Sequence, residues 1–194
     1  AKGAGMICLS MATMLSVVLC DAQVEASVWQ KMLRDAVELT FNRVTVDGDT
    51  STNDTLYGLA NGASGVSASD EESLKALSAA LTSVLGDLAY MLVKDGEGAS
   101  KVARIHVAGA ASDADAERVA RTVGHSQLVK TALYGRDANW GRIVAAVGRS
   151  GADFNPDDVV VTLCGVELFR KGQPTDLDFD ALLEEPLKQR DLPI

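Results

Sequence analysis

The chain has 194 residues, of which 47% are hydrophobic and 23% charged, a composition typical of a soluble globular protein with one domain or a compact two-layer unit. Its formal net charge of −9 at pH 7 argues against binding to nucleic acid, because the phosphate backbone requires a basic face. The three cysteines show neither a C-x-x-C pair nor a Cys/His spacing, so we expect no disulfide framework, no zinc site and a reducing compartment.

The first 21 residues, AKGAGMICLSMATMLSVVLCD, are rich in glycine at the start and nearly uncharged after Lys2. Four interpretations compete for them: a signal peptide, a membrane span, a buried strand over residues 14–19, or the cleavage site of an enzyme that makes its own N-terminal nucleophile. Glycines and hydroxyl residues interrupt the apolar run, which argues against both the signal peptide and a span of about 18 continuous apolar residues. We therefore expect no membrane contact here, and the residues alone leave the strand and the cleavage site open.

Helical and extended patterns alternate along the rest of the chain. Helices are predicted over residues 21–40, 71–93, 112–123, 127–134, 143–147 and 176–183, most clearly where leucines repeat every three or four positions in 71–93. Strands are predicted to begin at Val44 and Val46 and to cover residues 102–108, 158–165 and 166–169. Residues 190–194 look like the approach to a further strand. This alternation predicts an α/β or α+β fold.

A dense polar segment, DGDTSTND, occupies residues 47–54. Aspartate, asparagine, glycine and serine are typical of solvated turns. A calcium loop starting at Asp47 would need glycine at its sixth position and glutamate at its twelfth, and the chain has Thr52 and Gly58 there. We therefore expect no metal at this loop.

Several segments together resemble one enzyme family. They are KGAGMI at residues 2–7, MATML at 11–15, FNRVTVDGDTSTNDT at 41–55 with LANG at 59–62, KDGEGASK at 94–101, and VKTA at 129–132 with DANWGR at 137–142. These segments are similar to those of the ornithine acetyltransferase (glutamate N-acetyltransferase) family of arginine biosynthesis. One departure is Leu9-Ser10, where family members usually carry a proline–asparagine pair, and it bears on the efficiency of self-cleavage.

The resemblance implies that the bond between Ala12 and Thr13 is cut autocatalytically, so that residues 1–12 end an α chain and residues 13–194 form a β-chain domain. Thr13 would then be the catalytic nucleophile. A threonine hydroxyl needs a base to take its proton, and a free α-amino group, which titrates at about 7.7–8.0, supplies one. The resemblance also assigns Lys2, Thr13 and Glu97 to substrate binding, Lys2 facing a substrate carboxylate and Glu97 the amino end of ornithine.

The fold implied by the resemblance is a four-layer αββα sandwich of the self-cleaving, N-terminal-nucleophile type. The implied reaction moves acetyl from N2-acetyl-L-ornithine to L-glutamate through a threonyl acyl-enzyme, and some members also accept acetyl-CoA as co-substrate. No metal or bound cofactor is implied. The implied partner is the α chain of the same precursor in an α2β2-type assembly, in the cytoplasm or, in a eukaryote, the mitochondrial matrix.

Two alternatives stay open at this point. The first is a self-processing amidohydrolase or aminopeptidase of the same fold, which would release the acyl group to water. The second is an inactive, truncated chain that acts only in assembly. In the family, a Thr–Gly pair that builds the oxyanion hole precedes the segment present here, and an asparagine- and threonine-rich tail follows it. We therefore expect the 194-residue fragment alone to be inactive.

Overall fold

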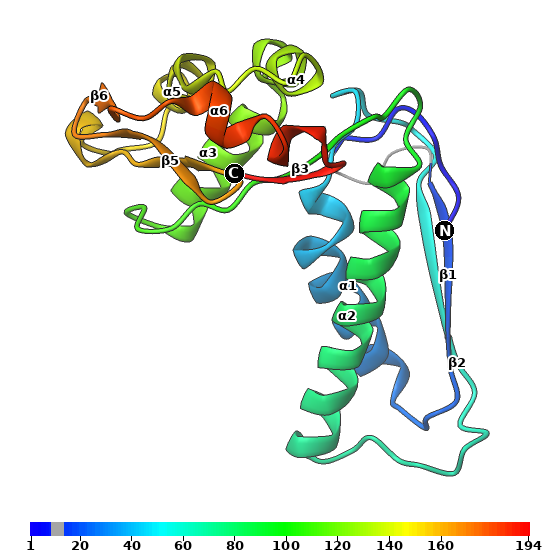
Figure 1. Cartoon of the computed structure of the whole chain (residues 1–194). Helices are drawn as coiled ribbons and strands as arrows, with labels where there is room; N and C mark the ends of the chain where they lie inside the picture. The colour runs from blue at the N-terminus through cyan, green and yellow to red at the C-terminus, as the bar shows by residue number, and fades with distance from the viewer. Residues whose placement is uncertain (9–13) are drawn as a thin grey trace. The chain divides into compact units, whose positions relative to one another are not determined.

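The structure is a computed structural model that describes residues 1–8 and 14–194 (Figure 1). Within these residues the chain forms two compact units, residues 1–99 and residues 100–194. Both units combine helices with short strands, which confirms the predicted α/β class.

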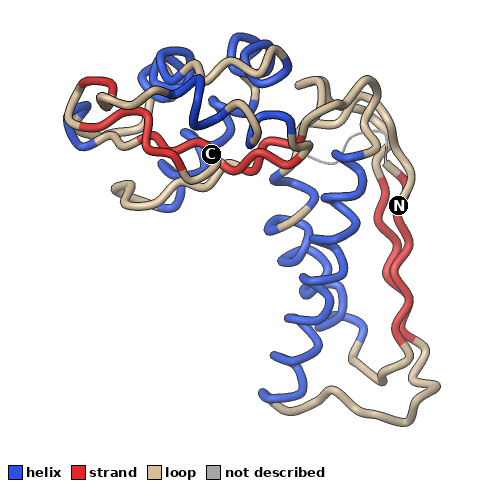
Figure 2. The backbone as a smooth tube through the Cα atoms, in the orientation of Figure 1, coloured by secondary structure: helices blue, strands red, loops and turns tan. Residues whose placement is uncertain are grey.

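Unit 1 is built on a parallel pair of strands, β1 (Leu15–Cys20) and β2 (Thr55–Ala60). Figure 2 shows the two strands running side by side along their length. Parallel neighbours need a crossover connection, and helix α1 (Ala26–Leu39) with the 3-10 turn η1 (Phe41–Arg43) provides it.

Helix α2 (Glu71–Lys94) lies beside α1 (Figure 1). Asp70 starts it through a capping box, because its side chain accepts a hydrogen bond from the Ser73 amide at 2.9 Å. By length and composition alone, α2 is apolar enough to cross a membrane, but core helices of soluble proteins pass the same test. One side of α2 packs into the core of unit 1. That core consists of Ile7, Met14, Trp29, Met32, Ala36, Val37, Phe41, Leu81, Leu85, Ala89 and Leu92.

The β1–β2 pair has one buried and one exposed face. Successive side chains of a strand point to opposite faces, so Ser16 is only 1% exposed while its neighbours in β1 face outward. The outward apolar side chains are Leu15, Val17, Leu19, Tyr57 and Leu59, each more than half exposed. We call these five residues the outer face. The strand expected near residues 14–19 therefore exists, but the prediction that it is buried is wrong for half of its side chains.

Unit 2 contains a parallel strand pair and an antiparallel sheet. Strand β3 (Val102–Arg104) pairs with β7 (Asp191–Pro193), and β4 (Val161–Leu163), β5 (Val166–Arg170) and β6 (Gln173–Pro174) form the sheet in that order. The helices are α3 (Asp113–Gly124), α4 (Gln127–Tyr134), α5 (Trp140–Gly148) and α6 (Phe179–Leu183), with 3-10 turns η2 (Pro156–Asp158) and η3 (Pro186–Lys188). The Trp140 ring stacks on Phe169 with 5.4 Å between centroids, which joins α5 to the sheet.

Some predicted element boundaries are wrong. The strand expected to begin at Val44 and Val46 is not seen within residues 1–8 and 14–194, where Thr45 forms an isolated bridge with Cys8. The strand of this region is β2, which follows the polar loop. The helix expected over residues 143–147 begins at Trp140, since the Asn139 side chain caps it by accepting from the Arg142 amide at 3.1 Å.

Other differences lie in unit 2. The strand expected over residues 102–108 ends at Arg104, and the segment expected over 158–165 is shortened to β4. Residues 190–194, expected to approach a further strand, contain strand β7 itself, which pairs with β3. The helix expected over 176–183 begins at Phe179, after Asp178 caps it through the Ala181 amide.

Candidate active site

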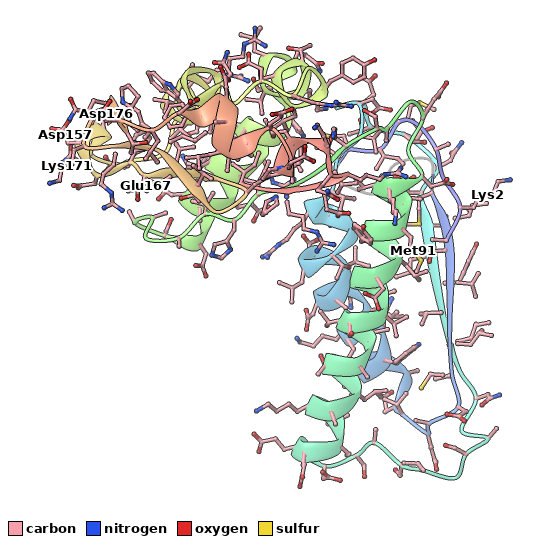
Figure 3. All side chains as sticks on the ribbon, viewed as in Figure 1. Lys2, Met91, Asp157, Glu167, Lys171 and Asp176 are labelled. Atoms are coloured by element: carbon pink, nitrogen blue, oxygen red, sulfur yellow. The ribbon has the colours of Figure 1, made fainter. Side chains whose placement is uncertain are left out.

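The N-terminal arm, residues 1–8, is held against β1 by main-chain hydrogen bonds. The Lys2 amide donates to the Leu15 carbonyl at 2.8 Å, and the Leu15 amide donates back to Lys2 at 3.0 Å. Figure 3 labels Lys2 on the arm, on the side of the strands away from α2. The backbone of Lys2 is therefore fixed while its ammonium group reaches solvent.

A single carboxylate, that of Asp47, holds the middle of the arm. Its Oδ2 accepts from the Met6 amide at 2.6 Å, and its Oδ1 accepts from the Ile7 amide at 3.1 Å. Met6 has a φ of 52°, a left-handed backbone that costs free energy for a residue with a side chain. The two hydrogen bonds to Asp47 offset this cost, so the carboxylate stabilises a turn that would otherwise relax.

Glu97 stands in the turn that ends α2. Gly96 presses its backbone against Val46, since a Cβ on Gly96 would lie 3.0 Å from both Val46 methyl carbons. Gly98 has a φ of 70°, which favours glycine. The Glu97 amide donates to the Ala4 carbonyl at 2.7 Å. The two glycines and this hydrogen bond together fix the backbone of Glu97 beside the arm.

Lys2 and Glu97 line the same open cavity of about 760 Å³. The other lining residues are Gly3, Ala4, Gly5, Met6, Leu15, Asp47 and Asn53. Among the described residues no hydrogen-bond or ion-pair partner is seen for the Glu97 carboxylate. A cavity lined by a lysine and by a carboxylate that has no partner within residues 1–8 and 14–194 suits a ligand that carries a carboxylate and an amine, as an amino acid does.

The start of β1 is tied to the end of the polar loop. Asp54 Oδ1 accepts from the Met14 amide at 2.7 Å, and the Thr55 amide donates to the Met14 carbonyl at 2.9 Å. The Asp54 Oδ2 atom is buried and has no hydrogen-bond partner within residues 1–8 and 14–194. Burial raises the pKa of this carboxyl, although the hydrogen bond from Met14 opposes the effect.

The structure brings together two of the predicted site residues, Lys2 and Glu97. Ala12 and Thr13, at which self-cleavage and nucleophilic attack are predicted, lie outside the described residues. Within the described parts of the chain no cluster of three or more His, Cys, Asp or Glu side chains could hold a metal ion.

Unit 2 has a smaller cavity of about 320 Å³, lined by residues of the DANWGR segment together with Phe179 and Asp180. Asn139 caps α5 and also donates from Nδ2 to Asp137 Oδ2 at 2.9 Å. The Arg142 guanidinium donates to the Leu128 carbonyl at 3.0 Å. These contacts cap α5 and hold it to α4, which gives the segment a structural role.

Sequence reasoning did not find Gly5, Asp47 and Asn53 as cavity residues. Two signals were present: the polar run that includes Asp47 and Asn53 matches a family segment, and Gly5 belongs to the KGAGMI segment. Neither pattern indicates that a loop some 40 positions downstream closes on the arm, because that contact depends on the tertiary fold.

The sequence pattern of the ArgJ family matches residues 1–194, the whole chain. The chain belongs to the ArgJ family. It is 74% identical over 194 residues to the arginine biosynthesis bifunctional protein ArgJ of Nitratidesulfovibrio vulgaris, and it covers 49% of that protein. It is 51% identical over 183 residues to the ArgJ protein of a Synechococcus strain, covering 44% of it. A chloroplastic ArgJ protein of Physcomitrium patens is 49% identical over 181 residues, and the chain covers 35% of it.

The fold is also that of a solved ArgJ-family structure. The crystal structure of arginine biosynthesis bifunctional protein ArgJ from Bacillus halodurans superimposes with a TM-score of 0.86 at 36% identity, over 93% of this chain and 87% of that one. The chain spans about half the length of the curated ArgJ relatives it matches.

Proposed function

We propose that this chain supplies the nucleophile and the amino-acid pocket of an enzyme that moves acetyl from N2-acetyl-L-ornithine to L-glutamate in arginine biosynthesis. The observation that carries the proposal is the cavity shared by Lys2 and Glu97 in a chain of the ArgJ family. The Lys2 ammonium would bind a substrate carboxylate, and the Glu97 carboxylate would bind the side-chain ammonium of ornithine.

The proposed nucleophile is Thr13, freed by cleavage of the Ala12–Thr13 bond. Its hydroxyl loses a proton to its own α-amino group, and the oxygen attacks the acetyl carbonyl carbon of N2-acetylornithine. The amide C–N bond breaks, the departing amine takes the proton, and the acetyl group stays on Thr13 as an ester. The amine of glutamate then attacks the ester, the C–O bond breaks, and the proton returns to the threonine oxygen.

The same site would accept acetyl-CoA as an alternative donor, since its thioester carbonyl can be attacked by the same oxygen. The residues proposed for the reaction need no bound cofactor. Relatives from bacteria and chloroplastic relatives from plants support the cytoplasm of a bacterium as the compartment, and none of the relatives named above is described as mitochondrial.

We propose that the outer face of the β1–β2 pair packs against the remaining half of the protein, the α chain of an α2β2-type assembly. Five large apolar side chains on one sheet face are exposed in unit 1, and monomeric proteins seldom leave such a patch in water. A second sheet on this face would produce the expected four-layer αββα sandwich, because unit 1 supplies one helical layer and one sheet layer.

The test uses a full-length chimera: the Nitratidesulfovibrio vulgaris ArgJ protein with its matching segment replaced by this chain. Intact mass and N-terminal sequencing of the chimera should reveal a new terminus at Thr13, and a Thr13→Ala variant should stay uncut. Labelled acetyl should then pass from N2-acetylornithine to glutamate. Release of acetate without transfer would indicate the amidohydrolase alternative instead, and an uncut, inactive chimera would indicate an assembly role.

A further inference from the structure

Gly5 lies between two carboxylates of the cavity. A Cβ atom built on Gly5 would stand 3.3 Å from Glu97 Oε2 and 3.7 Å from Asp47 Oδ2. The hydrogen atoms of Gly5 therefore leave open a space that directly adjoins the Glu97 carboxylate. Whatever binds to Glu97 from this side of the cavity must use that space.

The carboxylates of Asp47 and Glu97 differ in their hydrogen bonding. Asp47 accepts three main-chain hydrogen bonds, from the amides of Met6, Ile7 and Asp49, at 2.6, 3.1 and 3.0 Å. Its charge is thus compensated by the backbone that it holds. Glu97 has no such donors within the described residues, so its carboxylate is the one with lone pairs available to a ligand.

We propose that Gly5 is a specificity-determining residue: by lacking a side chain, it leaves beside Glu97 the room that the terminal ammonium of a diamino acid occupies. The inference rests on the proposed function, in which Glu97 binds that ammonium. An ammonium group approaches a carboxylate to about 2.7–2.9 Å and must be surrounded by space of its own size. A methyl group at position 5 would take part of this space and favour an amine on a shorter stem.

The substitution Gly5→Ala is a clean probe because the backbone of Gly5 is outside the left-handed region, where only glycine is unstrained. The nearest atom to the new methyl is the far end of the flexible Glu97 side chain, which need move only a few tenths of an ångström. The matched control is Gly86→Ala in α2, where the nearest atom, Thr40 Cγ2, stands at an ordinary 3.8 Å.

The experiment compares N2-acetylornithine with its diaminobutyrate homologue, which is one methylene shorter, in the full-length chimera. For Gly5→Ala we expect the ratio of kcat/KM for ornithine to that for the homologue to fall about tenfold, mainly through KM, with glutamate affected less. The Gly86→Ala variant should keep the wild-type ratio. An unchanged ratio in Gly5→Ala, even with lower activity towards both substrates, overturns the proposal.

Glu97→Gln separates this inference from the proposed function. If Glu97→Gln leaves kcat/KM for N2-acetylornithine unchanged, the assigned role of Glu97 is wrong, and the proposed role of Gly5 fails with it. If the chimera transfers no acetyl at all, calorimetric titration with the two acetylated amino acids measures the same preference without catalysis. Binding that prefers ornithine in the wild type and loses this preference in Gly5→Ala supports the inference, whereas an equal preference in both proteins contradicts it.

Discussion

The amide of Glu97 donates a hydrogen bond to the carbonyl oxygen of Ala4 at 2.7 Å, so the end of α2 and the N-terminal arm are joined at the cavity. Glu97 belongs to the turn after a long helix, and Ala4 to a segment that precedes the first strand. The cavity is therefore lined by parts of the sequence that are distant along the chain, and this hydrogen bond joins two of them.

We predict that Glu97→Gln lowers kcat/KM for N2-acetylornithine by about 10- to 100-fold in the chimera, because a hydrogen bond to a charged partner contributes roughly 1.5–3 kcal/mol. Transfer to glutamate, which has no side-chain ammonium, should change less. Steady-state kinetics with each substrate varied in turn measures the difference. Glu38→Gln, an exposed change on α1, is the control and should have no effect.

We predict that Asp47→Ala releases the arm. Without the carboxylate, the amides of Met6 and Ile7 lose their acceptor and the left-handed Met6 can relax. Hydrogen exchange should accelerate at these two amides while the amides within α2 keep their protection. Asp35→Ala removes an exposed carboxylate that pairs with Lys31 and serves as the control. Unchanged exchange at Met6 and Ile7 would mean that Asp47 does not hold the arm in solution.

Two glycine-to-alanine changes in unit 1 should have opposite effects on stability. A Cβ on Gly58 would clash with Leu33 Cδ1 and stand 3.0 Å from Trp29 Nε1, so Gly58→Ala overpacks the sheet–helix contact and should cost about 1–3 kcal/mol. Gly86→Ala meets only ordinary contacts inside α2 and should gain roughly 0.5–1 kcal/mol through helix propensity. Urea denaturation of both variants beside the wild type measures the free energy of unfolding.

Asp54 should make the free energy of unfolding fall as pH rises through the acidic range. Since burial raises its pKa in the folded state, the folded protein binds the proton more tightly than the unfolded chain does. Stability should therefore fall as pH rises from the ordinary pKa of aspartate through the raised one. Asp54→Asn should flatten this part of the pH profile, measured as the urea midpoint across acidic pH. A profile that Asp54→Asn leaves unchanged would contradict the prediction.

A charge on the outer face should weaken assembly and leave unit 1 folded. Leu19 is 74% exposed, so Leu19→Lys removes little buried area in this chain and should change the free energy of unfolding by less than about 0.5 kcal/mol. Association with a separately expressed α chain, followed by size-exclusion chromatography, should decline. Leu39→Lys, at a half-exposed leucine of α1, is the matched control. Equal association of both variants with the α chain would argue against the outer face as the contact surface.

Much of the helical structure could be predicted from local pattern. The leucine repeat over residues 71–93 predicts α2 to within one residue, because a helix buried on one side carries apolar residues at every third or fourth position of its sequence. Strand β2 could not be found in this way. Its outward residues Tyr57 and Leu59 are apolar, so the strand lacks the alternation of apolar and polar residues that marks a half-buried strand. Its pairing with β1 joins segments that are separated in the sequence by α1, and local pattern does not reveal such a pairing.

The candidate site was predicted only through resemblance. Lys2 is an ordinary lysine by pattern, and Glu97 an ordinary turn carboxylate between two glycines. That they line one cavity follows from the Lys2–Leu15 pairing and from the Ala4 carbonyl, neither of which has a local sequence signal. The proposed role of Gly5 follows only from its position between the carboxylates of Glu97 and Asp47, which the sequence does not reveal.

The contacts described for the arm link it to Leu15, Thr45, Val46, Asp47 and Glu97, all of them beyond residue 13. These contacts would hold the arm at the cavity even if the main chain were cut at the predicted bond between Ala12 and Thr13. We expect a separate peptide of the arm's sequence to form the same main-chain hydrogen bonds and so to place Lys2 at the same cavity. The hydrogen bonds described for the arm are thus of the kind that would hold a separate strand.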